Sequence, residues 1–582
     1  MYYSKKLQDE VDSDWISELP QHINHHILSL LPIEDAIRTS VLSKTWKSVF
    51  SSYNIVQSLH FDQNLFALEL LVSAESGQEP TVQELRDSFM KFVNNCLLTI
   101  KQQESPVLKL TLNVVVFNAE SSDLDRLMNL VRQIKVEELC IFVQTKASCW
   151  HDWYDERHEE DTCYDFPYPE IVFSSKWLQS LTVRGCRLSL TAGNYVVGMY
   201  SSLRHLWLSR VLVADEETLT NLASSCPWIE IIEFESCTFG METLTLSIFH
   251  KLKNASLADW MYGQILEVDI KESVNLESFH CSAPDMELSL NSASGGGRNI
   301  KELTLLESRF LFEDLTAIFP LLEKANIEIK DSDIDWFKAA NYHLRKLRIK
   351  CNTKLQEIHV DCPNLRYFKY RGRGCEKVFV DCPNLRELRY KAVQVPSSLE
   401  LNIPTDKCVV QFLFYLDCKF NTSWFVWLKV FLKHIAGRKI YLSLASFSGI
   451  EEEYVLNEFG ATIQPSQQNK VHLTVAMQKS SINQAFVDRL IWSTYPTTLT
   501  IHGGCDIVEY LCEILASKCR DGCCCKQFCI KCWWHNVEDV KASSGTEDMK
   551  ENLASMVEMH KTSTNKSSFT FKWRFESPLN GS

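Results

Sequence analysis

The densest group of potential metal ligands in this 582-residue chain lies near the C-terminus. Cys529, Cys532 and His535 are each separated by two residues, a spacing that suits thiolate and imidazole ligands of zinc. A structural zinc site takes four such ligands, and the sequence offers no second clean pair with this spacing. Two interpretations stay open, a zinc site and a set of buried or redox-sensitive thiols, of which we favour the thiols.

Known signatures of catalysis are missing from the sequence. It has no His-Glu-x-x-His motif, no phosphate-binding loop ending in Gly-Lys-Ser/Thr and no Gly-x-Ser-x-Gly elbow. The glycines at 295–297 precede Arg298 but lack the lysine of a phosphate-binding loop, so we interpret them as a turn. We therefore expect a protein that is not an enzyme and acts by binding.

The basic segment 344–391 is the clearest candidate for binding a negatively charged ligand. It holds thirteen Lys or Arg and five Asp or Glu, in a chain with a formal net charge of −14. Six of these cations occupy alternate positions of expected strands and would stack as a basic stripe: Arg348, Lys350, Lys369, Arg371, Arg389 and Lys391. We expect an acidic or phosphorylated substrate segment, or a polyphosphate cofactor, to bind there. The alternative is solvated charge that balances the acidic remainder of the chain.

Repeated units between residues 106 and 392 would position this stripe. They carry a Leu-x-x-Leu-x-Leu-like core, which begins at Leu178, Leu203, Ile229, Leu276, Ile300 and Leu344. Spacings of 24 to 26 residues fall in the range of leucine-rich repeats, and Val360–Arg366 recurs 20 residues later as Val380–Arg386. Alternate apolar residues would stack inside parallel strands, leaving the intervening residues on a continuous concave sheet. Several units lack a return helix, so we expect loops, turns or short strands there.

After residue 392 the pattern changes to alternating helices and strands. Helices are expected at 424–436, 485–492 and 507–517, and strands at 439–444, 471–475, 499–501 and 569–575. This pattern predicts an α/β cap over 393–540 that covers the open end of the repeats, then a linker and terminal strand over 541–582. Six acidic residues in 152–161 interrupt the repeats, which indicates a solvated loop.

Short amphipathic helices are expected at the N-terminus, over 12–52. Ile23, Ile27 and Leu31 fall on one helical face, which begins after Pro20 and ends at Pro32. A second helix is expected at 33–41 and a third from Lys44, with Ser43 as its N-cap. Three such short helices bury little surface, so the unit would gain stability from covering its apolar side chains with a partner.

This segment resembles an F-box. The matching residues are Ile16-Ser-x-Leu19-Pro20-x-x-Ile23, Ile27-Leu-Ser-x-Leu-Pro32 and Ala36-x-x-Thr39-Ser-Val-Leu-Ser-Lys-x-Trp46. The pattern is similar to that of the plant F-box/leucine-rich-repeat family, whose FBD-like C-terminal region is also resembled by the tracts that begin at Trp492 and Cys532. The resemblance implies an α/β fold: a three-helix F-box, a helical or linker entry over 53–105, a parallel-strand solenoid and the α/β cap.

By the same resemblance, the F-box binds a Skp-type adaptor, which is attached to a cullin. The adaptor-facing and core residues would be Leu19, Pro20, Ile23, Ile27, Leu28, Leu31, Val41, Leu42 and Trp46. Asn24 departs from the pattern, since an apolar residue is common there, and this departure would weaken adaptor binding.

The implied function is the substrate-recognition subunit of a Skp–cullin–F-box ubiquitin ligase, which brings an unidentified protein substrate close to the ubiquitin-charged enzyme. The alternatives are a repeat scaffold outside any ligase and a co-receptor for a small ligand. Acidic net charge argues against nucleic acid as a partner, and no apolar run of about 18 residues predicts a membrane span. Without a signal peptide, we expect the chain in the cytoplasm or nucleus with reduced cysteines, and with no cofactor beyond the polyphosphate and zinc alternatives.

Overall fold

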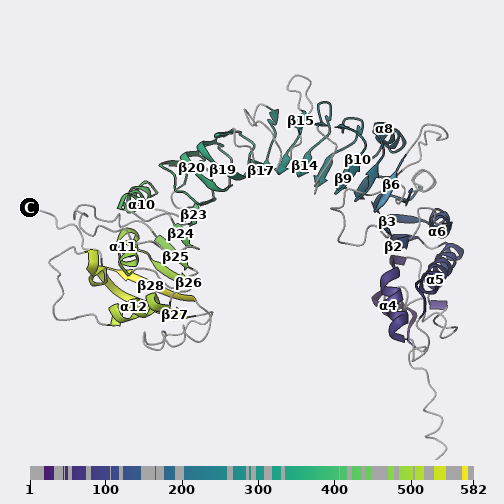
Figure 1. Ribbon diagram of the computed structural model, residues 1–582, viewed down its shortest axis with the longest axis horizontal. Coiled ribbons are helices and arrows are strands. Elements are labelled where there is room, and N and C mark those ends of the chain that lie inside the picture. Colours follow the sequence, from purple (N-terminus) through teal and green to yellow (C-terminus); the bar gives the residue numbers. More distant parts are fainter. Residues whose placement is uncertain are drawn as a thin grey trace, which may run out of the picture. The chain divides into compact units, whose positions relative to one another are not determined.

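The structure is a computed structural model of the chain (Figure 1). The chain divides into two compact units, residues 1–297 and 298–582. The residues that the structure describes are 19–31, 44, 46, 48–49, 56–73, 80–104, 106–116, 122–145, 164–165, 176–189, 202–258, 267–282, 287–289, 297–306, 318–329, 334–404, 407–415, 422–435, 439–446, 470–477, 484–502, 505–516, 530–544 and 566–574.

Parallel strands form the main sheet of the first unit. They are β1 (Val56–Asp62), β2 (Val107–Val116), β3 (Val136–Thr145), β5 (Ser180–Arg184), β7 (His205–Ser209), β9 (Ile231–Glu235), β12 (Asn254–Ala258) and β14 (Ser278–Ser282). Each strand pairs in parallel with the next one in this order. The predicted solenoid of parallel strands is therefore confirmed.

Short strands return the chain on the other side of several repeats, as the sequence predicted (Figure 1). One small sheet contains β4 (Tyr164–Asp165), β6 (Cys186–Leu188), β8 (Leu212–Val213) and β10 (Thr238–Phe239). A second contains β11 (Thr243–Thr245), β13 (Glu267–Asp269) and β15 (Glu287–Ser289). Between β8 and β9 the return is the helix α8 (Glu216–Ser225), which Asp215 caps by accepting a hydrogen bond from the Thr218 amide at 2.7 Å.

Alternation of apolar and polar residues explains which side of each strand is buried. In β9, Ile232 and Phe234 are 0% and 1% exposed, whereas Glu233 and Glu235 are only half-buried. Burial of one side chain in two is the signature of a strand with one face against the core. The core of each repeat is therefore completed by the repeats on both sides of it.

The solenoid begins earlier than the sequence analysis placed it. We expected a linker or helical entry over 53–105, but β1 pairs in register with β2, from Val56 opposite Val107 to Asp62 opposite Asn113. The helices α4 (Gln63–Ser73) and α5 (Val82–Gln103) connect these strands, and α6 (Ser122–Val131) connects β2 to β3. A reciprocal capping box between Thr81 and Glu84 fixes the start of α5.

The second unit has its own main sheet. Its parallel strands are β16 (Glu302–Leu306), β17 (Lys324–Ile329), β19 (Lys346–Asp361), β20 (Tyr367–Asp381), β21 (Glu387–Ala392), β23 (Val409–Tyr415), β24 (Lys439–Ser446), β25 (Lys470–Met477) and β26 (Thr498–His502). A shorter ribbon joins β18 (Trp336–Ala340), the second halves of β19 and β20, and β22 (Ser398–Asn402). The long strands β19 and β20 therefore contribute to both sheets.

A tight bend lets β20 pass from one sheet to the other. Gly372 lies at this bend, where an added Cβ would be 2.5 Å from the Tyr370 hydroxyl and 2.7 Å from the Cys351 carbonyl oxygen. Gly374 follows with a φ of +147°, and its carbonyl oxygen accepts a hydrogen bond from the Tyr370 hydroxyl at 2.9 Å. Only glycine fits both requirements, so the bend fixes where the exposed part of β20 ends.

The predicted boundary at 392/393 does not separate two sheets. β21 pairs in parallel with β23, and the sheet continues through β24 and β25 to β26. The predicted terminal strand is confirmed as β28 (Lys566–Trp573), which lies antiparallel between β26 and β27 (Val537–Ser544). The cap is therefore a continuation of the solenoid sheet, closed by two strands of opposite direction.

Helices cover one face of this extension. They are α10 (Thr422–His434), α11 (Gln484–Thr494) and α12 (Cys505–Ala516), followed by the 3-10 helix η3 (Ile530–Asn536). Phe412 of β23 packs edge-on against Phe431 of α10, with ring centroids 4.6 Å apart. None of the helices that the structure describes is long and apolar enough to span a membrane.

One buried carboxylate connects these covering helices. Asp488 of α11 accepts hydrogen bonds from the Tyr510 hydroxyl at 2.6 Å and from the Trp533 indole nitrogen at 2.8 Å. Burial raises the pKa of Asp488, while these two hydrogen bonds oppose that shift by favouring the charged form. Trp533 is fully buried, so the carboxylate fixes α12 and η3 to α11.

Cysteine side chains in the described residues belong mainly to the core, as expected. Eleven of the twelve free cysteines are buried, and Cys140 is half-buried. Burial raises the thiol pKa of Cys237, Cys362 and Cys382 to about 12. These groups are therefore protonated thiols at neutral pH.

We predict that Cys362 and Cys382 resist alkylation in the folded protein. At pH 8 both thiols are protonated and inaccessible, so modification by iodoacetamide should be about 100-fold slower than in urea. Pulsed alkylation followed by peptide mass spectrometry measures each site separately, with the half-buried Cys140 as the faster-reacting reference. Equal rates at the three sites in the native protein would contradict the buried placement.

Candidate interaction surfaces

The basic stripe is present on the main sheet of the second unit. Strand pairing places Arg348 of β19 opposite Lys369 of β20, which in turn lies opposite Arg389 of β21. Two residues further along, Lys350, Arg371 and Lys391 form a second row in the same way. The sequence predicted both this set and its stacking, and both follow from the repeat spacing of 20 to 22 residues.

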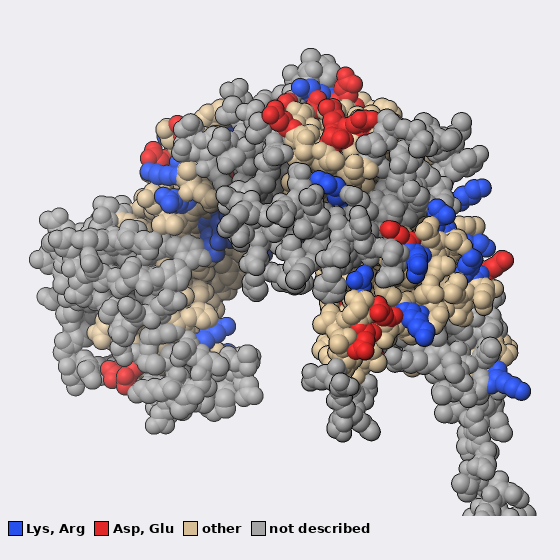
Figure 2. Space-filling model, turned by 45° about the vertical axis from the view of Figure 1, so that its right-hand side comes forward, with Lys and Arg blue, Asp and Glu red and all other residues tan. Residues whose placement is uncertain are grey.

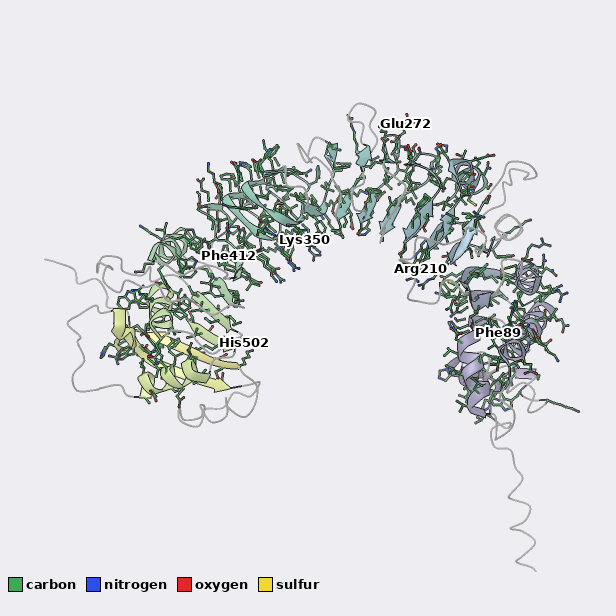
Figure 3. All side chains as sticks on the ribbon, in the orientation of Figure 1. Phe89, Arg210, Glu272, Lys350, Phe412 and His502 are labelled. Carbon is green, nitrogen blue, oxygen red and sulfur yellow. The ribbon has the colours of Figure 1, made fainter. Side chains whose placement is uncertain are left out.

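These six side chains lie on the face opposite the covering helices. They alternate along the strands with core residues such as Tyr390, whose ring packs against that of Phe412. In Figure 3, Lys350 is labelled on the sheet and Phe412 near α10. We call this face, which carries the basic stripe, the open face.

An aromatic ring that the sequence analysis did not single out organises the first row. Tyr367 lies two residues before Lys369, and the guanidinium groups of Arg348 and Arg389 lie 5.6 and 5.7 Å from its ring centre. Lys346 also approaches this ring, at 5.8 Å. The signal was available, because Tyr367 occupies the same alternating phase of the strand as Lys369 and Arg371.

Two carboxylates compensate the ends of the stripe. Glu328 of β17 is 5% exposed and lies 2.5 Å from the Lys350 ammonium group, while Glu387 lies 2.5 Å from Arg389 Nε. Glu387 also raises the pKa of Arg389 by accepting this hydrogen bond. Sequence reasoning missed both partners, because only the register of β17 and β21 shows which carboxylate meets which cation.

The centre of the stripe has no such compensation. Among the described residues, no carboxylate lies within 4 Å of Lys369 or Arg371. The pKa of Lys369 is lowered by burial first, and then by the positive charges of Arg348, Arg389, Arg371 and Lys391. Lys369 is therefore the point where the surrounding charges act together.

Mixed charge surrounds such sites elsewhere on the protein. On the face drawn in Figure 2, the described Lys and Arg side chains lie interspersed with Asp and Glu. Nucleic-acid-binding domains typically present a continuous basic surface instead. The stripe is a local concentration of charge on three strands.

A second candidate surface lies at the start of α1 (Gln21–Leu30). Leu19 and Ile23 are 36% and 37% exposed, and Pro20 between them is also exposed. The carbonyl oxygen of Pro20 accepts hydrogen bonds from the amides of Ile23 and Asn24, which fixes this first turn. Three apolar side chains at one helix end are therefore available to a partner.

Other predicted residues of this module lie inside it. Leu28, Trp46 and Val49 form a buried cluster, against which Ile27 and Leu31 pack. Leu28 and Trp46 thus belong to the core, whereas Leu19, Pro20 and Ile23 are open. The predicted residues Val41 and Leu42 and the second helix, 33–41, lie outside the described residues.

Asn24, the departure from the expected pattern, has a local role. Its side chain is 2% exposed and donates a hydrogen bond from Nδ2 to the carbonyl oxygen of Leu19 at 3.1 Å. This bond holds the segment that precedes α1 in place. The polar residue therefore faces inward and helps to position Leu19, so the predicted weakening of adaptor binding stays a prediction.

The zinc candidate stays a prediction. Cys529 and the side chain of Cys532 lie outside the described residues, and His535 is exposed at the end of η3. Among the residues whose side chains are described, no cluster of three or more His, Cys, Asp or Glu could hold a metal ion. The acidic segment 152–161 also lies outside the described residues.

Comparison with known protein families gives two matches. Residues 16–58 match the F-box domain, and residues 124–295 match the leucine-rich repeats described as "FBD-associated F-box protein At5g56370, LRR repeats". The chain combines an F-box with leucine-rich repeats. The F-box match contains the open residues Leu19, Pro20 and Ile23, and neither matching family is a family of enzymes.

Similar curated proteins come from Arabidopsis thaliana. The chain is 26% identical to the putative F-box/FBD/LRR-repeat protein At4g03220 over 46% of its own length and 47% of that protein. It is 32% identical to the F-box/LRR-repeat protein At3g58940 over 29% of its length and 24% of that protein. For the F-box/LRR-repeat protein At3g59190 the values are 28%, 39% and 51%. The matches thus span half or less of these relatives, and they confirm the resemblance to plant F-box/leucine-rich-repeat proteins.

We predict unequal effects when single cations of the stripe are neutralised. Lys350→Met leaves the buried Glu328 carboxylate without its cation and should destabilise the second unit by about 1–2 kcal/mol. Arg371→Met removes a charge that lacks a carboxylate partner and should change stability by less than about 0.5 kcal/mol. Hydrogen exchange of the β17 and β19 amides reports the difference, and equal protection in the two variants would show that Glu328 does not depend on Lys350.

Proposed function

We propose that this protein is the substrate-recognition subunit of a Skp–cullin–F-box ubiquitin ligase. Its F-box binds a Skp-type adaptor, and through the adaptor a cullin, while its leucine-rich repeats bind a protein substrate. The observation that carries the proposal is the exposure of Leu19 and Ile23 within a matched F-box whose remaining apolar residues form a core.

The physical basis of adaptor binding is the shortage of core in the F-box. Leu28, Trp46 and Val49 are buried, but a unit this small leaves Leu19, Pro20 and Ile23 at its surface. Covering these side chains with apolar groups of a partner contributes about 25 cal/mol for each Å² removed from water. Leu19 and Ile23 are four residues apart, so one shallow groove could take both.

The proposed role requires no catalytic residue in this chain. A receptor raises the local concentration of its substrate around the ubiquitin-charged enzyme that the cullin recruits, and effective concentrations in the millimolar range suffice. The repeats suit this role, because their strands place a long series of side chains on one side of each sheet. We propose the cytoplasm or the nucleus as its compartment, where the buried thiols stay reduced.

We predict that acidic substitutions at the exposed start of α1 abolish adaptor capture. The double substitution Leu19→Asp and Ile23→Asp places two carboxylates in an apolar contact and should weaken binding of a purified Skp-type adaptor by at least about 10-fold. His22→Asp is the matched control, because His22 is an exposed residue of the same turn. Biolayer interferometry with the full chain measures the affinities, and full binding by the double variant would remove the adaptor contact from these residues.

A second measurement tests the ligase role beyond adaptor binding. Proteins that co-purify with the wild-type chain when cullin activity is blocked should accumulate in cells that carry the Leu19→Asp/Ile23→Asp variant, because capture continues without ubiquitination. Their half-lives, measured after synthesis is stopped, should lengthen relative to cells with the His22→Asp control. Unchanged half-lives would instead favour a repeat scaffold outside any ligase.

A further inference from the structure

The centre of the basic stripe is built for a compact group with high negative charge. The open face carries six cations on three adjacent strands, which are about 4.8 Å apart. Glu328 and Glu387 compensate only Lys350 and Arg389, at opposite ends, while Lys369 and Arg371 have no carboxylate partner among the described residues. An anion over Lys369 would relieve the repulsion between these neighbours.

The donor set favours a phosphate group over a single carboxylate. Arg348, Arg371 and Arg389 supply three guanidinium forks around the ammonium group of Lys369. A phosphate ester carries a charge of nearly −2 at neutral pH and three acceptor oxygens, so it can take donors from both rows at once. The Tyr367 ring holds Arg348 and Arg389 on either side, which reduces the ordering that binding must impose.

The surface beside the stripe favours an extended segment over a free ion. The first row continues in register from Arg389 to Gln411, Tyr441, His472 and Thr498. All four are half-buried polar side chains of the open face, and the rings of Tyr441 and His472 stack at 4.7 Å. Five strands, from β21 to β26, extend this row by about 19 Å, the length of roughly six residues of extended chain.

We propose that the open face binds a phosphorylated serine or threonine in an extended segment of a partner protein. The phosphate lies over Lys369 and Arg371 within the basic stripe, and the residues on one side of it lie across Gln411, Tyr441 and His472. This proposal rests on the proposed function, because the phosphorylated segment belongs to the substrate that the receptor presents. Phosphorylation would then decide when the substrate is captured.

Direct binding tests the phosphate requirement. The purified full chain is titrated against fluorescein-labelled eleven-residue peptide libraries, with a central phosphoserine or phosphothreonine and degenerate flanks. Anisotropy should show the phosphorylated library binding at least about 10-fold more tightly than the unphosphorylated one. Equal binding of the two libraries would overturn the proposal.

A matched pair of variants separates the site from overall charge. Lys369→Glu/Arg371→Glu should lose at least about 10-fold in affinity for the phosphorylated library. Lys338→Glu/Lys377→Glu carries the same change of net charge on exposed residues of the shorter ribbon, and it should bind as the wild type does. Equal losses in both variants would mean that only long-range charge matters, as expected for solvated cations.

Competition and selectivity test whether a segment is bound. Phosphopeptides selected from the library should share residues on one side of the phosphate, and Gln411→Ala/His472→Ala should broaden that selection. Inorganic tripolyphosphate should compete only at higher concentration than the selected peptide. If tripolyphosphate competes as well as the peptide and no flanking preference exists, the ligand is a free polyphosphate and the proposal fails.

Adaptor binding of the same variants keeps the two proposals distinguishable. Lys369→Glu/Arg371→Glu should capture the Skp-type adaptor as the wild type does, because its substitutions lie outside the F-box. Loss of peptide binding with adaptor capture retained supports the site within a functional receptor. A chain that captures the adaptor but no phosphopeptide overturns the site alone, and one that binds phosphopeptide but no adaptor overturns only the ligase role.

Discussion

In-register stacking of parallel strands is the constraint on which the rest of this structure depends. A residue on one strand has, as its neighbour about 4.8 Å away, the residue of the same phase in the next repeat. Inside the protein this rule produces continuous rows of apolar side chains, such as Tyr370 beside Tyr390 with stacked rings 4.9 Å apart. On the open face the same rule brings like charges together, because nothing in the geometry can separate them.

The stacking also explains why charge and core are coupled here. Glu328 is almost fully buried, and it is stabilised there by Lys350 from the neighbouring strand. The glycines after Arg371 end the flat part of β20, so the cations occupy a short platform and not a long groove. A solenoid can thus place a binding group at one repeat without altering the repeats on either side.

Much of this arrangement could be predicted from the sequence, because the repeats have a nearly constant length. Spacings of 20 to 26 residues fixed which positions stack, and this is why Arg348, Lys369 and Arg389 were placed together correctly. The partners of these cations could not be predicted, since Glu328 comes from a strand outside the basic segment. Nor could the start of the sheet, because β1 lacks the Leu-x-x-Leu pattern, and only its pairing with β2 identifies it. In the F-box, periodicity placed Leu28 and Ile23 on one helix, but packing decided that Leu28 faces inward.

The insertion of β28 between β26 and β27 has a consequence for shortened forms of the chain. The parallel sheet would otherwise end at β26 with a row of unpaired amides and carbonyls, which invites pairing with another molecule. The last described strand of the sequence fills that position, so folding of the sheet waits for the end of translation. A premature stop before residue 566 would therefore yield a sticky, misassembling product and not merely a receptor without its tail.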